Sequence, residues 1–235
     1  MPNSRTPRII GRVLKITMGL LVLSVCLILL FRICSSGDPK SVDVLIPNEE
    51  LCRLYEEKGD KVLLRYQNQP SITRGEHNSG YFSVTQYVFI PEADQVQLVF
   101  RYNNSTLEHL QKDYHLKQLP KKSAHVFDVS LVLVETDPND PEKTVKVRYA
   151  PVEEYTVKDT ESKGLYTYYR YVFEGIDVTD KTVGVFVDVY YVGDIDYEKD
   201  AYGRLCLYDT EHKWITQKWT SADKKAMEAW IEKRK

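Results

Sequence analysis

Four acidic residues alternate with other residues in the stretch GDIDYEKDAYG, near the C-terminal end of the chain. They are Asp194, Asp196, Glu198 and Asp200. Carboxylate oxygens bind calcium, but the ion takes roughly six to eight oxygen ligands from a loop that turns back on itself. An EF-hand loop opening at Asp194 requires Gly at its sixth position and Glu at its twelfth, where Lys199 and Leu205 stand. We therefore expect a solvated loop between two strands and no cofactor, with calcium binding as the alternative.

Tyrosine is the compositional outlier, with 17 residues, many of them in segments that alternate like strands. Amphipathic tyrosine suits a half-buried sheet, so packing in the core and in cross-strand pairs is the interpretation that we favour. If one face of the sheet binds a ligand, five residues are our candidates for it. They are Tyr166, Tyr168, Arg170, Asp188 and Tyr190. Exposed tyrosines on such a face would stack against sugar rings, which gives a carbohydrate-binding module as an alternative function.

Two of the four cysteines fall in the part of the chain expected to form the folded domain. A disulfide between Cys52 and Cys206 is permitted outside the cell and would close a long loop. In the sequence RLCLY, however, Cys206 alternates with Leu205 and Leu207, which also allows it to be a core residue. Both interpretations remain open from the sequence, because the geometry of the two sulfurs decides between them.

Catalytic motifs are absent from the sequence. It contains no H-E-x-x-H, no paired-cysteine motif, no G-x-S-x-G and no glycine-rich phosphate loop. We therefore predict that the protein is not an enzyme. A hydrolase with a dispersed active site is the alternative, since catalytic triads are defined by geometry and not by their order in the sequence.

Charge is distributed unevenly along the chain. The net charge is −2 overall, but residues 1–37 hold five basic residues and no acid, which leaves 27 basic against 34 acidic residues beyond them. Neutralisation of phosphates by Lys and Arg supplies most of the non-specific affinity for nucleic acids. An acidic domain without a basic cluster therefore indicates that nucleic acid is not a partner.

The N-terminal region has the pattern of a membrane signal anchor. Residues 16–31 carry no charge, and Lys15 and Arg32 flank them. The upstream basic residues predict a cytoplasmic N-terminus, so the remainder of the chain would lie outside. The expected organisation is a cytoplasmic segment 1–15, a transmembrane helix 16–33, a tether 34–47 and an extracytoplasmic domain 48–235. Secretion after signal cleavage is the alternative, for which ICSSG offers only a weak site.

The sequence pattern of the domain is typical of a mainly β fold. Segments rich in Val, Tyr, Phe and Thr alternate with a period of two and are separated by turn-like clusters such as PEAD and TDPNDPEK. This pattern predicts an antiparallel β-sandwich, immunoglobulin-like or jelly-roll-like, with short flanking helices. We expect the strands 165–174 and 183–192 to form a hairpin in which Arg170 faces Asp188.

Three helices are expected around the strands. Asn48 and Gly59 have the residue types of a helix start and stop around residues 49–58. Ser105 and Glu108 have the spacing of a capping box for a second helix. Residues 221–235 form an amphipathic C-terminal helix that is expected to pack back on the sheets.

The sequence thus predicts a location more than an activity. We expect a single-pass membrane protein whose outer domain is a non-catalytic module that contacts another protein or the cell envelope. The membrane is one expected partner, through the N-terminal helix, and the second partner is not identified by any motif.

Overall fold

A computed structural model describes residues 6–36, 39–67, 79–122, 124–197, 201–209 and 214–235. The chain divides into two units, Met1–Asp38 and Pro39–Lys235, which are considered separately below. The helices are α1 Thr6–Ser36, α2 Glu49–Lys58, α3 Thr106–Asp113 and α4 Ser221–Arg234, with four short 3-10 helices, η1 Gly59–Lys61, η2 Ser79–Tyr81, η3 Pro91–Ala93 and η4 Val192–Asp194.

The first unit is helix α1. Its apolar window Leu14–Phe31 has a mean hydropathy of 2.5, and none of that window is buried against the rest of the protein. Eighteen helical residues extend about 27 Å, close to the ~30 Å of a bilayer's hydrocarbon core. The helix is therefore long and apolar enough to span a membrane, as the sequence predicted.

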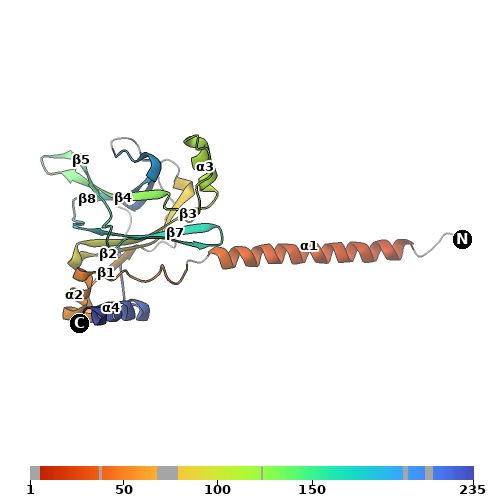
Figure 1. Cartoon of the computed structure of the whole chain (residues 1–235), viewed down its shortest axis with the longest axis horizontal. Helices are drawn as coiled ribbons and strands as arrows, with labels where there is room; N and C mark the ends of the chain where they lie inside the picture. The colour runs from red at the N-terminus through yellow and green to blue at the C-terminus, as the bar shows by residue number, and fades with distance from the viewer. Residues whose placement is uncertain (1–5, 37–38, 68–78, 123, 198–200, 210–213) are drawn as a thin grey trace. The chain divides into compact units, whose positions relative to one another are not determined.

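The second unit contains two antiparallel sheets, which confirms the expectation of a mainly β domain (Figure 1). Sheet A has the strand order β10-β1-β2-β3-β7-β6 and consists of β1 Leu64–Gln67, β2 Phe82–Ile90, β3 Gln95–Asn103, β6 Val157–Lys163, β7 Tyr166–Glu174 and β10 Trp214–Gln217. Sheet B has the order β5-β4-β8-β9 and consists of β4 Phe127–Asp137, β5 Asp140–Tyr149, β8 Thr182–Tyr191 and β9 Gly203–Asp209.

The main hydrophobic core lies between the two sheets. Alternate residues of β3 and β7, such as Phe100 and Tyr171, meet alternate residues of β4 and β8, such as Leu131 and Val187, and all four are fully buried. Burying one such side chain contributes roughly 1.5–3 kcal/mol. The alternation of buried and outward residues along these strands agrees with the period of two in the sequence.

The predicted hairpin of the strands 165–174 and 183–192 is wrong. Strand β7 pairs with β3 and β6, whereas β8 pairs with β4 and β9 in the other sheet. The connection between them is anchored by Ile176, which is fully buried and donates its N–H to the carbonyl of Asp94 at 2.7 Å. The chain therefore crosses from one sheet to the other, and the inward residues of β7 and β8 face each other across the core.

A second core lies on the outer side of sheet A. Helices α2 and α4 pack there over β1 and the end of β2, with Leu51, Leu64, Ile90 and Met227 almost fully buried (Figure 1). The Trp219 indole N–H donates to the Val62 carbonyl at 3.0 Å. The predicted packing of the C-terminal helix against the sheets is thus confirmed.

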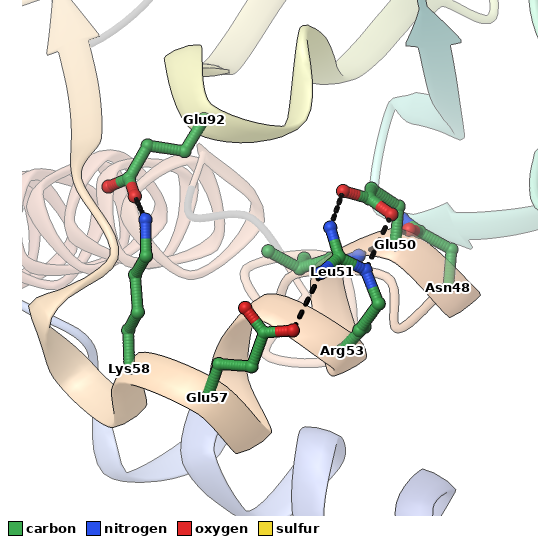
Figure 2. Close-up of polar contacts among 7 residues, drawn as sticks. All are labelled: Asn48, Glu50, Leu51, Arg53, Glu57, Lys58 and Glu92. Atoms are coloured by element: carbon green, nitrogen blue, oxygen red, sulfur yellow. Dashed lines mark hydrogen bonds and ion pairs between the residues drawn. The ribbon is translucent and has the colours of Figure 1, made fainter.

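Helix α2 has the caps that the sequence indicated. The Asn48 side chain accepts the N–H of Leu51, and Gly59 follows the helix with a φ of 62°. Figure 2 shows Arg53 between Glu50 and Glu57, and Lys58 paired with Glu92 of η3. These polar contacts fix the solvent side of α2 and join its end to the turn before β3.

Helix α3 begins without the predicted capping box. The Ser105 side chain makes no capping bond to the helix, and instead its N–H and hydroxyl both donate to Asn103 Oδ1, at 3.0 and 3.1 Å. The capping box does form at α4, between Thr220 and Asp223. Ser105 has helical backbone angles (φ −66°, ψ −20°) and not the extended conformation that is typical of an N-cap residue, so its oxygen does not accept a helix N–H.

Residues 39–48, which we name the N-terminal arm, belong to the folded unit. The arm was predicted to be mostly tether, but Val42, Leu45 and Ile46 have relative exposures of 3%, 2% and 8%. It lies against the outer side of β3 and β7, where Val42 packs with Val99 and Tyr168. The outer face of sheet A is therefore covered by α2, α4 and the arm.

Candidate functional site

The outer side of sheet B carries a cluster of arginine and tyrosine side chains, which we name the β8 face. Its members are Arg148, Phe186, Asp188, Tyr190, Tyr197 and Arg204. Because Val185, Val187 and Val189 of β8 point into the core, the alternate residues Phe186, Asp188 and Tyr190 must point outward. The register places Arg204 of β9 directly beside Asp188.

The Asp188 carboxylate is the centre of the β8 face. It is 1% exposed, yet it is paired: Arg204 Nε donates to Oδ1 at 2.5 Å and Arg204 Nη2 donates to Oδ2 at 2.8 Å. The Tyr190 hydroxyl donates to Oδ2 at 3.4 Å, and Arg148 Nη2 lies 3.6 Å from the same oxygen. A buried carboxylate is stable only with such partners, because an isolated ion is costly to remove from water.

Arg148 is held between two aromatic rings. Its guanidinium carbon lies 5.5 Å from the ring centre of Tyr190 and 5.4 Å from that of Tyr197, within the range of cation–π attraction. The two rings meet edge to face at 5.0 Å, and Arg148 Nη1 donates to the Tyr197 carbonyl at 2.8 Å. These contacts fix the guanidinium while a third of the side chain, 34%, stays exposed.

The groups of the β8 face are hydrogen-bond donors and aromatic rings that are held in fixed positions. Arg204 binds both oxygens of Asp188, so this carboxylate is not placed to accept a proton from a substrate. Burial, followed by the nearby Asp188 charge, raises the pKa of Tyr190, which keeps the hydroxyl protonated as a donor. An ordered arginine and a half-exposed tyrosine can instead bind carbonyl or carboxylate oxygens of a partner.

The five predicted binding residues are divided between the two sheets. Asp188 and Tyr190 lie on the β8 face, whereas Tyr166, Tyr168 and Arg170 lie on the outer side of sheet A. The predicted pair of Arg170 with Asp188 is therefore wrong, and each has another partner: Arg170 Nη1 donates to the Val44 carbonyl at 3.4 Å.

On sheet A the three remaining candidates make contacts within the domain. Tyr168 is 1% exposed beneath the arm, and the Arg101 guanidinium lies 4.3 Å from the centre of the Tyr166 ring. Arg101 also donates from Nε to the Ser83 hydroxyl at 2.8 Å. These contacts bind β2, β3 and β7 to one another and to the arm.

The predicted calcium ligands are only partly described. Asp194 ends η4 and Asp196 follows it, while Glu198 and Asp200 lie outside the described residues. Over the described ranges, no three His, Cys, Asp or Glu side chains are grouped as a metal site. The calcium alternative thus stays a prediction.

Cys52 and Cys206, the pair offered for a possible disulfide, are not bridged to each other. Cys52 is buried in the second core, 3.5 Å from the Met227 sulfur, whereas Cys206 lies on β9 of sheet B. The core interpretation of Cys206 is also wrong, because Leu205 and Leu207 point into the core and Cys206 therefore points outward, partly exposed.

Sequence reasoning missed Arg148, Tyr197 and Arg204. One signal was available: Arg204 precedes the alternating Leu205 and Leu207, so it had to point outward beside another strand. Asp188 is the only acid in its strand and needed a basic partner. The identity of that partner depends on strand order, which the sequence does not encode locally.

No protein-family model, curated protein or solved structure matches this chain.

Proposed function

We propose that this chain is a single-pass membrane protein whose β domain lies outside the cytoplasm and serves as a non-catalytic binding module. Its partner is another protein or a component of the cell envelope. Helix α1 supports anchoring, because its apolar side chains are exposed throughout the window Leu14–Phe31. The basic residues before the helix support an outward orientation of the domain.

The observation that carries the proposal is the difference between the two outer sheet faces. The chain's own helices and arm cover sheet A, whereas the β8 face is topped by long side chains of sheet B and the loop after β8. That loop adds three exposed apolar or aromatic residues, Val192, Ile195 and Tyr197, with relative exposures of 39%, 38% and 49%. Tyr and Arg beside apolar groups are typical of binding hot spots.

We further propose that the two sheets form a β-sandwich of immunoglobulin-like or jelly-roll-like type. The support for a sandwich is the single core that the two sheets share.

A carbohydrate-binding module is supported less well by the same observations. That alternative depended on a row of exposed tyrosines that included Tyr168 and Tyr190. Their relative exposures are 1% and 3%, so neither ring face is available to stack on a sugar in this conformation.

Site-specific photocrosslinking tests the proposed contact surface. A photoreactive phenylalanine replaces Tyr197 in the full chain, in its membrane, and we expect a discrete crosslinked product. The same group at Leu165, which is 51% exposed and lies on the sheet A side of the chain, serves as the matched control and should give none. Arg148→Ala combined with the Tyr197 probe should abolish the product. Equal products at both positions, or a product that is insensitive to Arg148→Ala, would contradict the β8 face as the contact surface.

A further inference from the structure

The N-terminal arm is held mainly through its main chain. Ile46 donates its N–H to Gln97 Oε1 at 2.7 Å and accepts from Gln97 Nε2 at 2.9 Å. Gln97 thus bonds both main-chain groups of one residue, which is the pairing that a neighbouring strand would supply. The Leu45 N–H donates to Asp223 Oδ1 at 2.9 Å.

Two further side chains reach main-chain carbonyls of the arm. Gln86 Nε2 donates to the Asp43 carbonyl at 3.2 Å, and Arg170 Nη1 donates to the Val44 carbonyl at 3.4 Å. The groups that bind the arm therefore come from β2, β3, β7 and α4. Contacts to main-chain groups depend little on the sequence of the bound segment, and this mode is common to peptide-binding surfaces.

The side chains that the arm contributes are few and apolar. Val42 rests on Val99 and Tyr168, and Leu45 enters the second core. Lys40 and Asp43 point to solvent. An ordered peptide ligand is held in a similar way, with main-chain bonds for affinity and a few side chains in apolar pockets.

The buried amides beneath the arm are unusual for a purely structural cover. Gln95 and Gln97 of β3 have relative exposures of 0% and 5%, and Gln97 Nε2 donates to Gln95 Oε1 at 2.9 Å. The same oxygen accepts from Nδ2 of Asn48, the last residue of the arm, which is 0% exposed, also at 2.9 Å. Burying polar groups costs free energy unless every group is bonded, so an apolar face would cover a sheet more simply. Here the amides present one donor and one acceptor to the arm.

We propose that the outer face of sheet A is a peptide-binding groove that the N-terminal arm keeps closed. The residues that line this groove are Gln86, Gln97, Val99, Arg170 and Asp223. Its ligand is a non-helical peptide segment with apolar side chains at the positions that Val42, Leu45 and Ile46 occupy in the arm. The arm is bound as a ligand of its own domain. A peptide with the same main-chain groups binds when the arm is released.

The test uses the full chain and a synthetic peptide of residues 39–48. The double variant Val42→Asp, Ile46→Asp weakens the arm and leaves every wall residue of the groove unchanged. We expect this variant to melt at a lower temperature than the wild type, and the peptide to raise its Tm in a concentration-dependent way, because a ligand of the native state stabilises it. The wild type, whose groove is filled, should show no shift.

Two controls make the result specific. Lys40→Asp changes the charge of the arm by the same amount at an exposed position, and it should behave like the wild type. Adding Gln97→Ala to the double variant removes both bonds to Ile46 and should abolish the peptide-dependent shift. No Tm shift of the double variant up to millimolar peptide, or a shift that survives Gln97→Ala, would overturn the proposal.

Hydrogen exchange of the wild-type chain gives an answer even if the double variant fails to fold. The proposal predicts that the amides of Leu45 and Ile46 exchange through local opening, at least tenfold faster than the slowest amides of β3. Exchange of both sets at one common rate would mean that the arm leaves only when the whole domain unfolds, and the groove would then be no binding site.

Discussion

At the scale of single residues, we expect the stability of the domain to be most sensitive to substitution of Asp188. Its carboxylate is 1% exposed and receives both nitrogens of Arg204. Removing one partner of a buried ion pair leaves the other charge without compensation, and this costs about 3–5 kcal/mol. The charge of Asp188 thus stabilises the folded domain and holds the arginines of the β8 face in place.

Asp188→Asn should lower the free energy of unfolding by about 1.5–3 kcal/mol, less than for a fully buried pair, because Arg204 and Arg148 lose their shared carboxylate but are themselves partly exposed to water. Chemical denaturation of the full chain in nanodiscs measures the change. Asp140→Asn is the control: its pair with Lys143 is exposed, and such pairs contribute about 0–1 kcal/mol. Equal effects of the two substitutions would show that Asp188 is not the charge centre described.

The two domain cysteines should differ strongly in reactivity. Burial raises the pKa of Cys52 to about 11, so its thiol is protonated at neutral pH, and it is also shielded from reagents. In a Cys26→Ser, Cys34→Ser background at pH 7.5, a maleimide should label the folded chain at Cys206 only. Cys206→Ser should therefore remove nearly all labelling, and Cys52→Ser should remove little. Rapid labelling of Cys52 in the native state would contradict its position in the second core.

At the scale of elements, the sequence predicted the type of each element better than its partner. The alternation of inward and outward residues along β7 and β8 agrees with the period of two in the sequence. The caps of α2 could be predicted because they depend on Asn48 and Gly59 alone. The pairing of β7 with β3 could not be predicted in the same way, since it joins residues that are about 70 positions apart along the chain. The arm was missed for a related reason: its bonds to the sheet use main-chain groups, which leave no pattern in the sequence.

The end of α2 should make stability depend on pH in the acid range. The Lys58 bond and the Leu63 N–H bond lower the pKa of Glu92 below its ordinary 4.5. A carboxylate with a depressed pKa stabilises the folded state above its unfolded pKa, and this contribution is lost as the pH falls through the folded pKa.

Glu92→Gln should therefore lower the denaturation midpoint at pH 7, and wild type and variant should converge at acid pH, once the pH has fallen through the lowered pKa of Glu92. Denaturation of both proteins between these pH values measures the difference. A gap between the two midpoints that is the same at all pH values would show that the carboxylate charge contributes nothing at this contact.

At the scale of the whole molecule, the folded domain begins at the arm. Deleting the arm removes three buried apolar side chains, each worth roughly 1.5–3 kcal/mol, which is a large share of the total stability of a typical domain. A chain starting at Pro39 should therefore melt like the domain of the full-length protein, and one starting at Glu49 should fold but melt at a lower temperature. Circular dichroism melting compares them, and equal melting temperatures would refute the assignment of the arm to the fold.

Membrane anchoring with the β domain outside is the central claim of this account. It is tested most directly by labelling single cysteines with a membrane-impermeant maleimide in intact spheroplasts, in a chain whose own cysteines are serine. We predict that Lys40→Cys is labelled in intact spheroplasts and that Ser4→Cys is labelled only after the membrane is permeabilised, with both chains retained in the membrane fraction. Labelling of Ser4→Cys but not of Lys40→Cys before permeabilisation, or recovery of the full-length chain in the soluble fraction, would contradict the account.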